Sequence, residues 1–117
     1  MATSSPPSDR RRWVRYPADI KTVFQSIVPK EDDYHSALIR DVSRGGMRLE
    51  FDRPMQPGTL LKIIINNPVK ARLVHATPLP NGKWALGCAL TMELGQAELL
   101  ELLESRRGDQ EAVIGDQ

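Results

Sequence analysis

Turn-forming residues punctuate the centre of this chain at short, even intervals, and that spacing limits what the chain can fold into. Clusters rich in proline, glycine and asparagine recur about every 10 to 15 residues from residue 29 to residue 82. This is close to the spacing expected of β-sandwiches and β-barrels. The spacing predicts an all-β domain with strands near residues 18–27, 34–42, 46–52, 59–66, 69–77 and 83–92.

Apolar and polar side chains alternate along several of these segments, which is typical of an antiparallel sheet with one buried face. Met47, Leu49 and Phe51 share one face, whereas Arg48 and Glu50 lie on the other. The last segment repeats the pattern with an apolar face of Trp84, Leu86, Cys88, Leu90 and Met92. Because an open sheet of such short strands would leave exposed edges, the pattern favours closure into a small β-barrel.

After Met92 the apolar period becomes that of a helix. The sequence predicts a helix of about 10 to 13 residues. Its apolar stripe is formed by Leu99, Leu100, Leu102 and Leu103. Arg106 and Arg107 suit the negative end of the helix dipole, and Gly108 is a plausible stop. A helix this short needs to pack on the barrel or on another chain.

The organisation expected is one domain with short polar ends. Residues 1–9 are expected to form a disordered leader, residues 10–107 the domain and residues 108–117 a flexible tail. The single cysteine cannot form an internal disulfide, which fits a reducing compartment. Without a signal peptide or a run of apolar residues long enough for a bilayer, we expect a cytoplasmic protein with no membrane insertion.

The sequence offers little for catalysis. His35 and His75 each stand alone on a predicted strand, and no metal-ligand spacing occurs. Cys88 shares the apolar face of its strand, so we expect a buried, inert thiol. We therefore predict no enzyme activity, no catalytic residues, no metal and no cofactor.

Charge is distributed unevenly along a chain whose net charge is only +1. Residues 1–92 hold 14 Lys/Arg and 8 Asp/Glu, a balance of +6. Residues 93–117 hold 2 Lys/Arg and 7 Asp/Glu, a balance of −5. Four arginines between residues 10 and 15 repel one another unless an anion lies among them, which indicates an anionic partner.

The arginines form an Arg-x-x-x-Arg motif at Arg11 and Arg15, preceded by Arg10. The planar guanidinium matches phosphate oxygens and the O6/N7 edge of guanine, and it stacks on purines. Two such groups on a flexible arm can reach around one ligand. The alternative is a solvated basic tail beside the barrel.

The second motif, Asp41-x-Ser43-x-x-Gly46, lies at the junction of two predicted strands. A carboxylate can accept both N1–H and N2–H of guanine, and the serine adds a donor or acceptor. The glycines Gly45 and Gly46 permit positive φ and close approach of a ligand to the backbone. The alternative is a hairpin turn with side-chain hydrogen bonds and a left-handed glycine. Together the two motifs favour an anionic guanine nucleotide.

With both motifs in this order, the sequence resembles the PilZ domain family, bacterial receptors for cyclic di-GMP. The strand from Gly45 to Leu49 and the glycine-containing strand from Gly87 to Leu90 also match that family. The resemblance spans roughly residues 10 to 105. It implies a six-stranded antiparallel β-barrel with a C-terminal α-helix.

The resemblance also implies roles for individual residues. Arg11 and Arg15 would clamp phosphates and guanine edges, and Asp41, Ser43 and Gly46 would hold a guanine. Arg10, just before the first motif, is associated in the family with binding two stacked cyclic di-GMP molecules per chain. Possible additional ligand residues are Arg12, Arg44 and His75. Trp13 could stack on a guanine or pin the arm to the barrel, and the second is favoured.

The expected mechanism is ligand-gated ordering of an arm that has little apolar anchorage, with output through an unknown protein partner. Two alternatives remain open: a PilZ-type adaptor that binds no nucleotide, and a small barrel that binds nucleic acid through its basic arm. The small share of aromatic residues, 5%, weakens the second, so no nucleic acid is expected.

Overall fold

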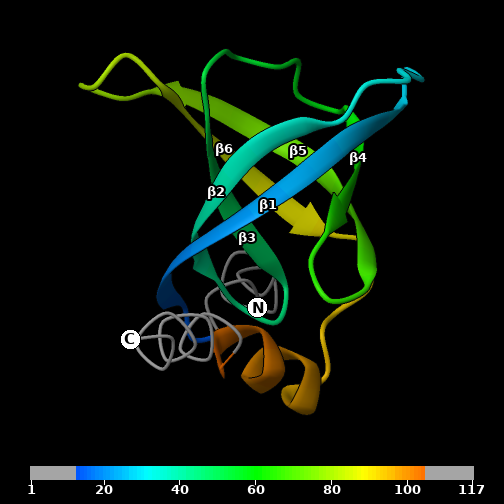
Figure 1. Cartoon of the computed structure of the whole chain (residues 1–117), viewed down its shortest axis with the longest axis vertical. Coiled ribbons are helices and arrows are strands. Elements are labelled where there is room, and N and C mark those ends of the chain that lie inside the picture. The colour runs from blue at the N-terminus through cyan, green and yellow to red at the C-terminus, as the bar shows by residue number, and fades with distance from the viewer. Residues whose placement is uncertain (1–12, 105–117) are drawn as a thin grey trace, which may run out of the picture.

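The computed structural model describes residues 13–104, and these form a closed β-barrel followed by one helix (Figure 1). The barrel order is β1-β2-β3-β6-β5-β4, with every neighbouring pair antiparallel. Its strands are β1 (Tyr16–Val28), β2 (His35–Val42), β3 (Gly46–Phe51), β4 (Leu60–Ile64), β5 (Pro68–Pro78) and β6 (Trp84–Leu90). The predicted fold class is confirmed, and each predicted strand has its counterpart.

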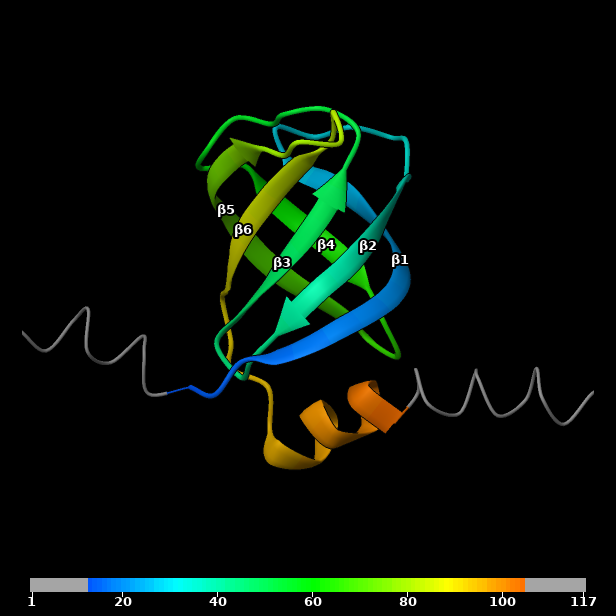
Figure 2. The ribbon, with the colours of Figure 1, turned by 90° about the vertical axis from the view of Figure 1, so that its left-hand side faces the viewer.

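The long strand β1 closes the barrel because it pairs with two neighbours. Tyr16 to Phe24 pair with β2, and Val23 to Val28 pair with β4. Because β1 pairs with one strand along each half, it must be long and strongly curved, as the blue ribbon in Figure 2 shows. The two pairings place the start of β1 beside the end of β2, which is where the second sequence motif begins.

Side chains that alternate along the strands fill the barrel interior. Met47, Leu49 and Phe51 are buried on β3 as predicted, whereas Arg48 is exposed. Phe24 is fully buried and meets the Phe51 ring edge-on, with 4.9 Å between ring centroids. Other buried apolar residues of the same core are Ala18, Ala37, Ile39, Val42, Leu61, Ile63, Ala71, Leu73, Leu86 and Cys88.

The helix covers one end of the barrel (Figure 2). Residues 96–104 are helical in the part of the chain that the structure describes, and Leu94, Leu99 and Leu102 join the barrel core. The predicted stripe is wrong at Leu100, whose exposure is 49%. Each helical residue turns by about 100°, so Leu100 points away from the face that Leu99 and Leu102 share.

The predicted helix end at Arg106, Arg107 and Gly108 lies outside the described residues, as do the predicted leader and tail. Among residues 13–104, no helix has the length and apolar character needed to cross a bilayer.

Candidate functional site

The turn between β2 and β3 is closed by the side chain of Ser43. Its hydroxyl oxygen accepts hydrogen bonds from the backbone N–H of Gly45 (3.2 Å) and of Gly46 (3.1 Å). The hydroxyl in turn donates to the carbonyl of Gly46 at 3.3 Å. These contacts use most of the hydrogen-bonding capacity of a hydroxyl, and Ser43 is only 3% exposed. Ser43 therefore shapes the turn, and its direct contact with a ligand stays a prediction.

The glycines of this turn are needed for space. Neither glycine has the positive φ of the left-handed hairpin alternative, because only Gly58 and Gly82 have positive φ among the described residues. A Cβ on Gly46 would lie 2.7 Å from the carbonyl oxygen of Cys88 on β6. A Cβ on Gly45 would lie 2.6 Å from the indole of Trp13. Gly46 thus allows β3 to approach β6, and Gly45 provides a flat surface that an aromatic ring can cover.

Asp41 faces outward because the strand register shifts beside it. Two residues of β2, Arg40 and Asp41, follow the buried Ile39 before Val42 returns to the core. Such an irregularity redirects side chains, and it is common next to functional sites. The carboxylate of Asp41 is therefore half-buried on the outer wall of the barrel, at the start of the turn.

Two arginines bind the Asp41 carboxylate. Nη1 of Arg15, from the arm, lies 2.5 Å from Oδ1, and Nε of Arg48, from β3, lies 2.9 Å from Oδ2. The Arg15 side chain is 60% exposed, whereas the Asp41 side chain is 16% exposed. Since a carboxylate has about four acceptor positions, each oxygen keeps room for a further donor such as a guanine N–H. The two sequence motifs therefore meet at this ion pair.

Arg48 was not among the predicted site residues. A signal for it was present, because a hairpin closing at residues 43–46 pairs Asp41 with Arg48 across the two strands. Opposite charges at such paired positions attract each other.

His75 reaches the same region from β5. A second register shift, between Leu73 and His75, leaves both Val74 and His75 exposed. The imidazole lies over Gly87 of β6, where a Cβ would be 2.4 Å from the ring. The absence of a side chain at Gly87 is what gives His75 its place beside the turn.

A cavity of about 380 Å³ connects these features. Arg15, Ser43, Gly46 and His75, all predicted site residues, line it, and Asp41 adjoins it through Arg15. The remaining wall is formed by Trp13, Gly45, Val74, Gly87, Cys88, Ala89, Leu90 and Glu93, of which sequence reasoning connected only Trp13 and Gly45 with a ligand. Val74 and Glu93 belong to neither motif, so no local signal marked them as site residues.

Among the described candidate residues, Arg44 does not line this cavity. Arg10, Arg11 and Arg12 lie outside the described residues. Arg44 is directed to the segment before the helix, where its Nε donates to the carbonyl of Leu94 at 2.9 Å. Arg44 thus points neither to open water nor into the cavity.

Trp13 anchors the arm. Its indole covers Gly45, and the guanidinium carbon of Arg44 lies 4.7 Å from the ring centroid. The expectation of little apolar anchorage is therefore wrong at this residue. Pinning of the arm, the interpretation favoured from sequence, matches these contacts.

Burial raises the pKa of the Cys88 thiol from 9.0 to about 12. The prediction of a buried thiol is confirmed, since Cys88 is 6% exposed. The thiol stays protonated at pH 8, and the thiolate is the reactive form.

We therefore expect iodoacetamide to alkylate native Cys88 at least about 100-fold more slowly than an exposed thiol at pH 8. Mass spectrometry of samples quenched over time measures the rate, and the same protein in guanidinium chloride gives the reference. Equal rates in the two samples would contradict an inert thiol.

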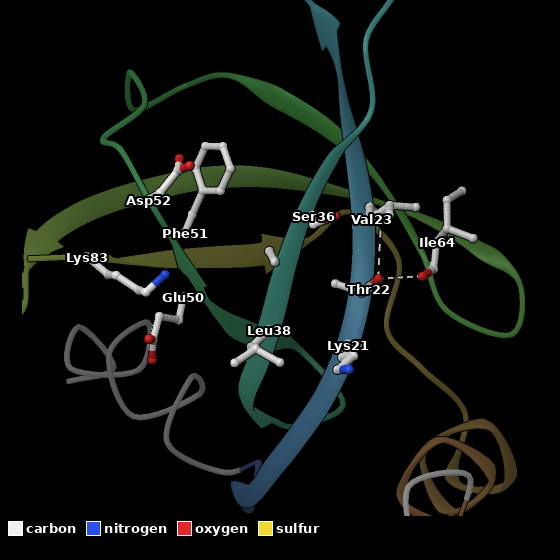
Figure 3. Close-up of a pocket in the computed structure, with 11 residues that line it drawn as sticks. Lys21, Thr22, Val23, Ser36, Leu38, Glu50, Phe51, Asp52, Ile64 and Lys83 are labelled. Atoms are coloured by element: carbon white, nitrogen blue, oxygen red, sulfur yellow. Dashed lines mark hydrogen bonds between the residues drawn. The ribbon is translucent and has the colours of Figure 1, made fainter. Parts of the chain in front are cut away.

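A larger cavity, of about 730 Å³, lies elsewhere on the barrel wall (Figure 3). Strands β1, β2 and β3 supply most of its lining, including Lys21, Leu38 and Glu50. None of the candidate ligand residues within residues 13–104 lines it. Among residues 13–104, no group of three or more His, Cys, Asp and Glu side chains is placed to hold a metal ion.

Comparison with family models decides the family of this chain. The PilZ domain model matches residues 9–105, which is most of the sequence. The chain belongs to the PilZ domain family. PilZ domains are generally non-catalytic receptors for cyclic di-GMP. A comparison with curated proteins gave no match.

Two solved structures share the barrel of this PilZ domain. The Bacillus subtilis inhibitor of motility (MotI/DgrA) superposes with a TM-score of 0.60 at 18% identity, over 86% of this chain. This chain spans about half of that protein, 51% of its length. The PilZ domain of CeSA from a cellulose-synthesizing bacterium gives a TM-score of 0.53 at 19% identity, with 79% of this chain and 96% of that one covered. At these identities the likeness concerns the fold.

Proposed function

We propose that this PilZ domain is a bacterial cyclic di-GMP receptor whose site is the cavity between the arm and the turn that joins β2 and β3. The ion pair between Arg15 and Asp41 is the observation that carries the proposal. It joins Arg15 of the first motif to Asp41 of the second, beside a cavity that Arg15, Ser43 and Gly46 line.

The residues divide into two groups by role. Asp41 accepts the guanine N1–H and N2–H groups, while Ser43 and Gly46 fix the turn that presents it. Arg11 and Arg15 bind the phosphates and the guanine edge, for which the guanidinium fork is suited. His75 can lie flat against a base, because Gly87 leaves space beneath its ring.

Arg10 extends the basic arm by one residue, and we propose that the site therefore holds two stacked ligands per chain. Arg12 supplies a further phosphate contact. Each cyclic di-GMP carries a negative charge on every phosphate, so a pair of them suits a run of arginines.

Binding neutralises the arm and folds it across the cavity, which changes the shape and charge of one surface. The signal then passes to a separate protein partner. We place this receptor in the cytoplasm, where its lone, buried cysteine stays reduced.

Isothermal titration calorimetry of the purified protein tests the proposal. We expect saturable binding of cyclic di-GMP with about two ligands per chain, and no comparable binding of GTP or GMP. A ratio near one ligand per chain would support the receptor function but reject the proposed role of Arg10. A folded protein that binds none of the three nucleotides would overturn the receptor and favour a PilZ-type adaptor.

A further inference from the structure

The indole of Trp13 occupies part of the proposed ligand site. It lines the same cavity as Ser43, Gly46 and His75. It also covers the backbone of Gly45, in the turn that follows Asp41, at a distance that leaves no room for a methyl group. A guanine held by Asp41 and lying against this turn would compete with the indole for Gly45.

Arg44 connects the same indole to the helix. Its guanidinium lies over the Trp13 ring, with 4.7 Å from the guanidinium carbon to the ring centroid. Its Nε donates to the carbonyl of Leu94 at 2.9 Å, and the Leu94 N–H donates back to the Arg44 carbonyl at 2.8 Å. Leu94 is 2% exposed and lies two residues before the helix at 96–104.

These contacts form a continuous path from the arm to the helix. Stacking on an aromatic ring fixes the plane of a guanidinium, and that plane sets the direction in which Nε donates. Loss of the indole leaves Arg44 free to turn toward an anion in the cavity. The Leu94 carbonyl then loses its side-chain donor, and the helix loses one of its ties to the barrel.

We propose that Trp13 is a built-in plug of the ligand site, and that Arg44 transmits its displacement to the C-terminal helix. This inference rests on the proposed function and adds its regulation. Without ligand, Trp13 covers Gly45 and Arg44 holds Leu94. Cyclic di-GMP displaces the indole, Arg44 turns to the ligand phosphates, and the helix opens more often.

Amide hydrogen exchange measures the opening of the helix. Leu99 is the reporter, because its N–H donates to the Gly95 carbonyl at 3.0 Å in the first helical turn. We expect saturating cyclic di-GMP to speed exchange at Leu99 at least about fivefold, since local opening equilibria respond to lost tertiary contacts. Unchanged or slower exchange would overturn the relay.

Trp13→Ala removes the plug while leaving the arginines in place. Without ligand, this variant should exchange Leu99 faster than wild type, and it should bind cyclic di-GMP several-fold more tightly. Val14→Ala is the matched control, because Val14 is the next arm residue and is 62% exposed. Equal Leu99 exchange in the two variants would overturn the coupling between arm and helix.

Arg44→Lys tests whether Arg44 transmits the displacement of Trp13 to the helix or only supports the fold. Lysine keeps the positive charge but cannot stack as a plane on the indole. In this variant, hydrogen exchange at Leu99 should no longer change when ligand binds.

Coupling is reciprocal, so loosening the helix must also change ligand affinity in the wild type. Ala97→Gly, at an exposed helical position, loosens the helix.

The Ala97→Gly change should raise affinity for cyclic di-GMP in the wild type and leave it unaltered in Arg44→Lys. A purely structural arginine would give the same change in both backgrounds, which would overturn the relay. If no variant binds cyclic di-GMP, the proposed function fails. The ligand-free comparison of Trp13→Ala with Val14→Ala still decides whether the arm and helix are coupled.

Discussion

Asp41→Ala should weaken cyclic di-GMP binding at least about 100-fold, because it removes a charged acceptor for two guanine N–H groups. The change also leaves Arg15 and Arg48 without the carboxylate that aligns them. The barrel should stay folded, since ion pairs at partly exposed positions contribute about 1 kcal/mol or less to stability. Calorimetric titration measures the affinity, and thermal unfolding measures the stability.

Asp19→Ala is the matched control for this experiment. Asp19 is also a carboxylate on the barrel wall bound to an arginine, at 3.0 Å from Nη1 of Arg40, but Arg40, unlike Arg15, does not line the cavity. We expect Asp19→Ala to bind cyclic di-GMP as tightly as wild type does.

Arg15→Ala should lose binding as Asp41→Ala does. Wild-type affinity in Asp41→Ala would refute the role assigned to this carboxylate.

Phe24→Ala should lower the free energy of unfolding by about 3–5 kcal/mol, the usual cost of removing a fully buried aromatic ring. Phe24 is 0% exposed and packs against Phe51 and His35, with ring centroids 4.9 and 5.5 Å away. Domains of this size are stable by about 5–15 kcal/mol, so the variant should be close to unfolding at ambient temperature. Urea denaturation followed by circular dichroism gives the value.

Val23→Ala, the neighbouring position on β1, provides the comparison. Val23 points to the outer wall and is 36% exposed, so its truncation should cost less than about 1 kcal/mol. Similar losses in both variants would contradict the inward and outward alternation of β1.

The barrel could be predicted because its signals are local. Turn residues mark the strand ends, and the alternation of Met47, Leu49 and Phe51 with charged residues marks the buried face. Both signals come from residues close together in the sequence, so they can be recognised without knowledge of the tertiary structure. The error at Leu100 arose because the adjacent leucine was assigned to the stripe despite its different helical angle.

The site could be predicted only in part, because several of its features depend on contacts between distant segments. The motif residues Asp41 and Arg15 were identified, and the structure brings them together. The role of Gly46 depends on the carbonyl of Cys88, far along the chain, and no local pattern gives that distance. Arg44 was predicted only as a possible ligand residue, and its bond to Leu94 likewise joins segments that are remote in sequence.

Each strand of the barrel has a partner on both sides, because β1 pairs with β2 and with β4. Proteins that recruit an extended peptide as an added strand need a sheet edge with unpaired backbone groups. Within residues 13–104, residues 16–21 of β1 pair with β2 alone and residues 75–78 of β5 pair with β6 alone, so one-sided pairing is left to short stretches at strand ends such as these two. We therefore expect a peptide that joins this barrel as a strand to pair only at such stretches, and any other binding protein to recognise side chains or the helix.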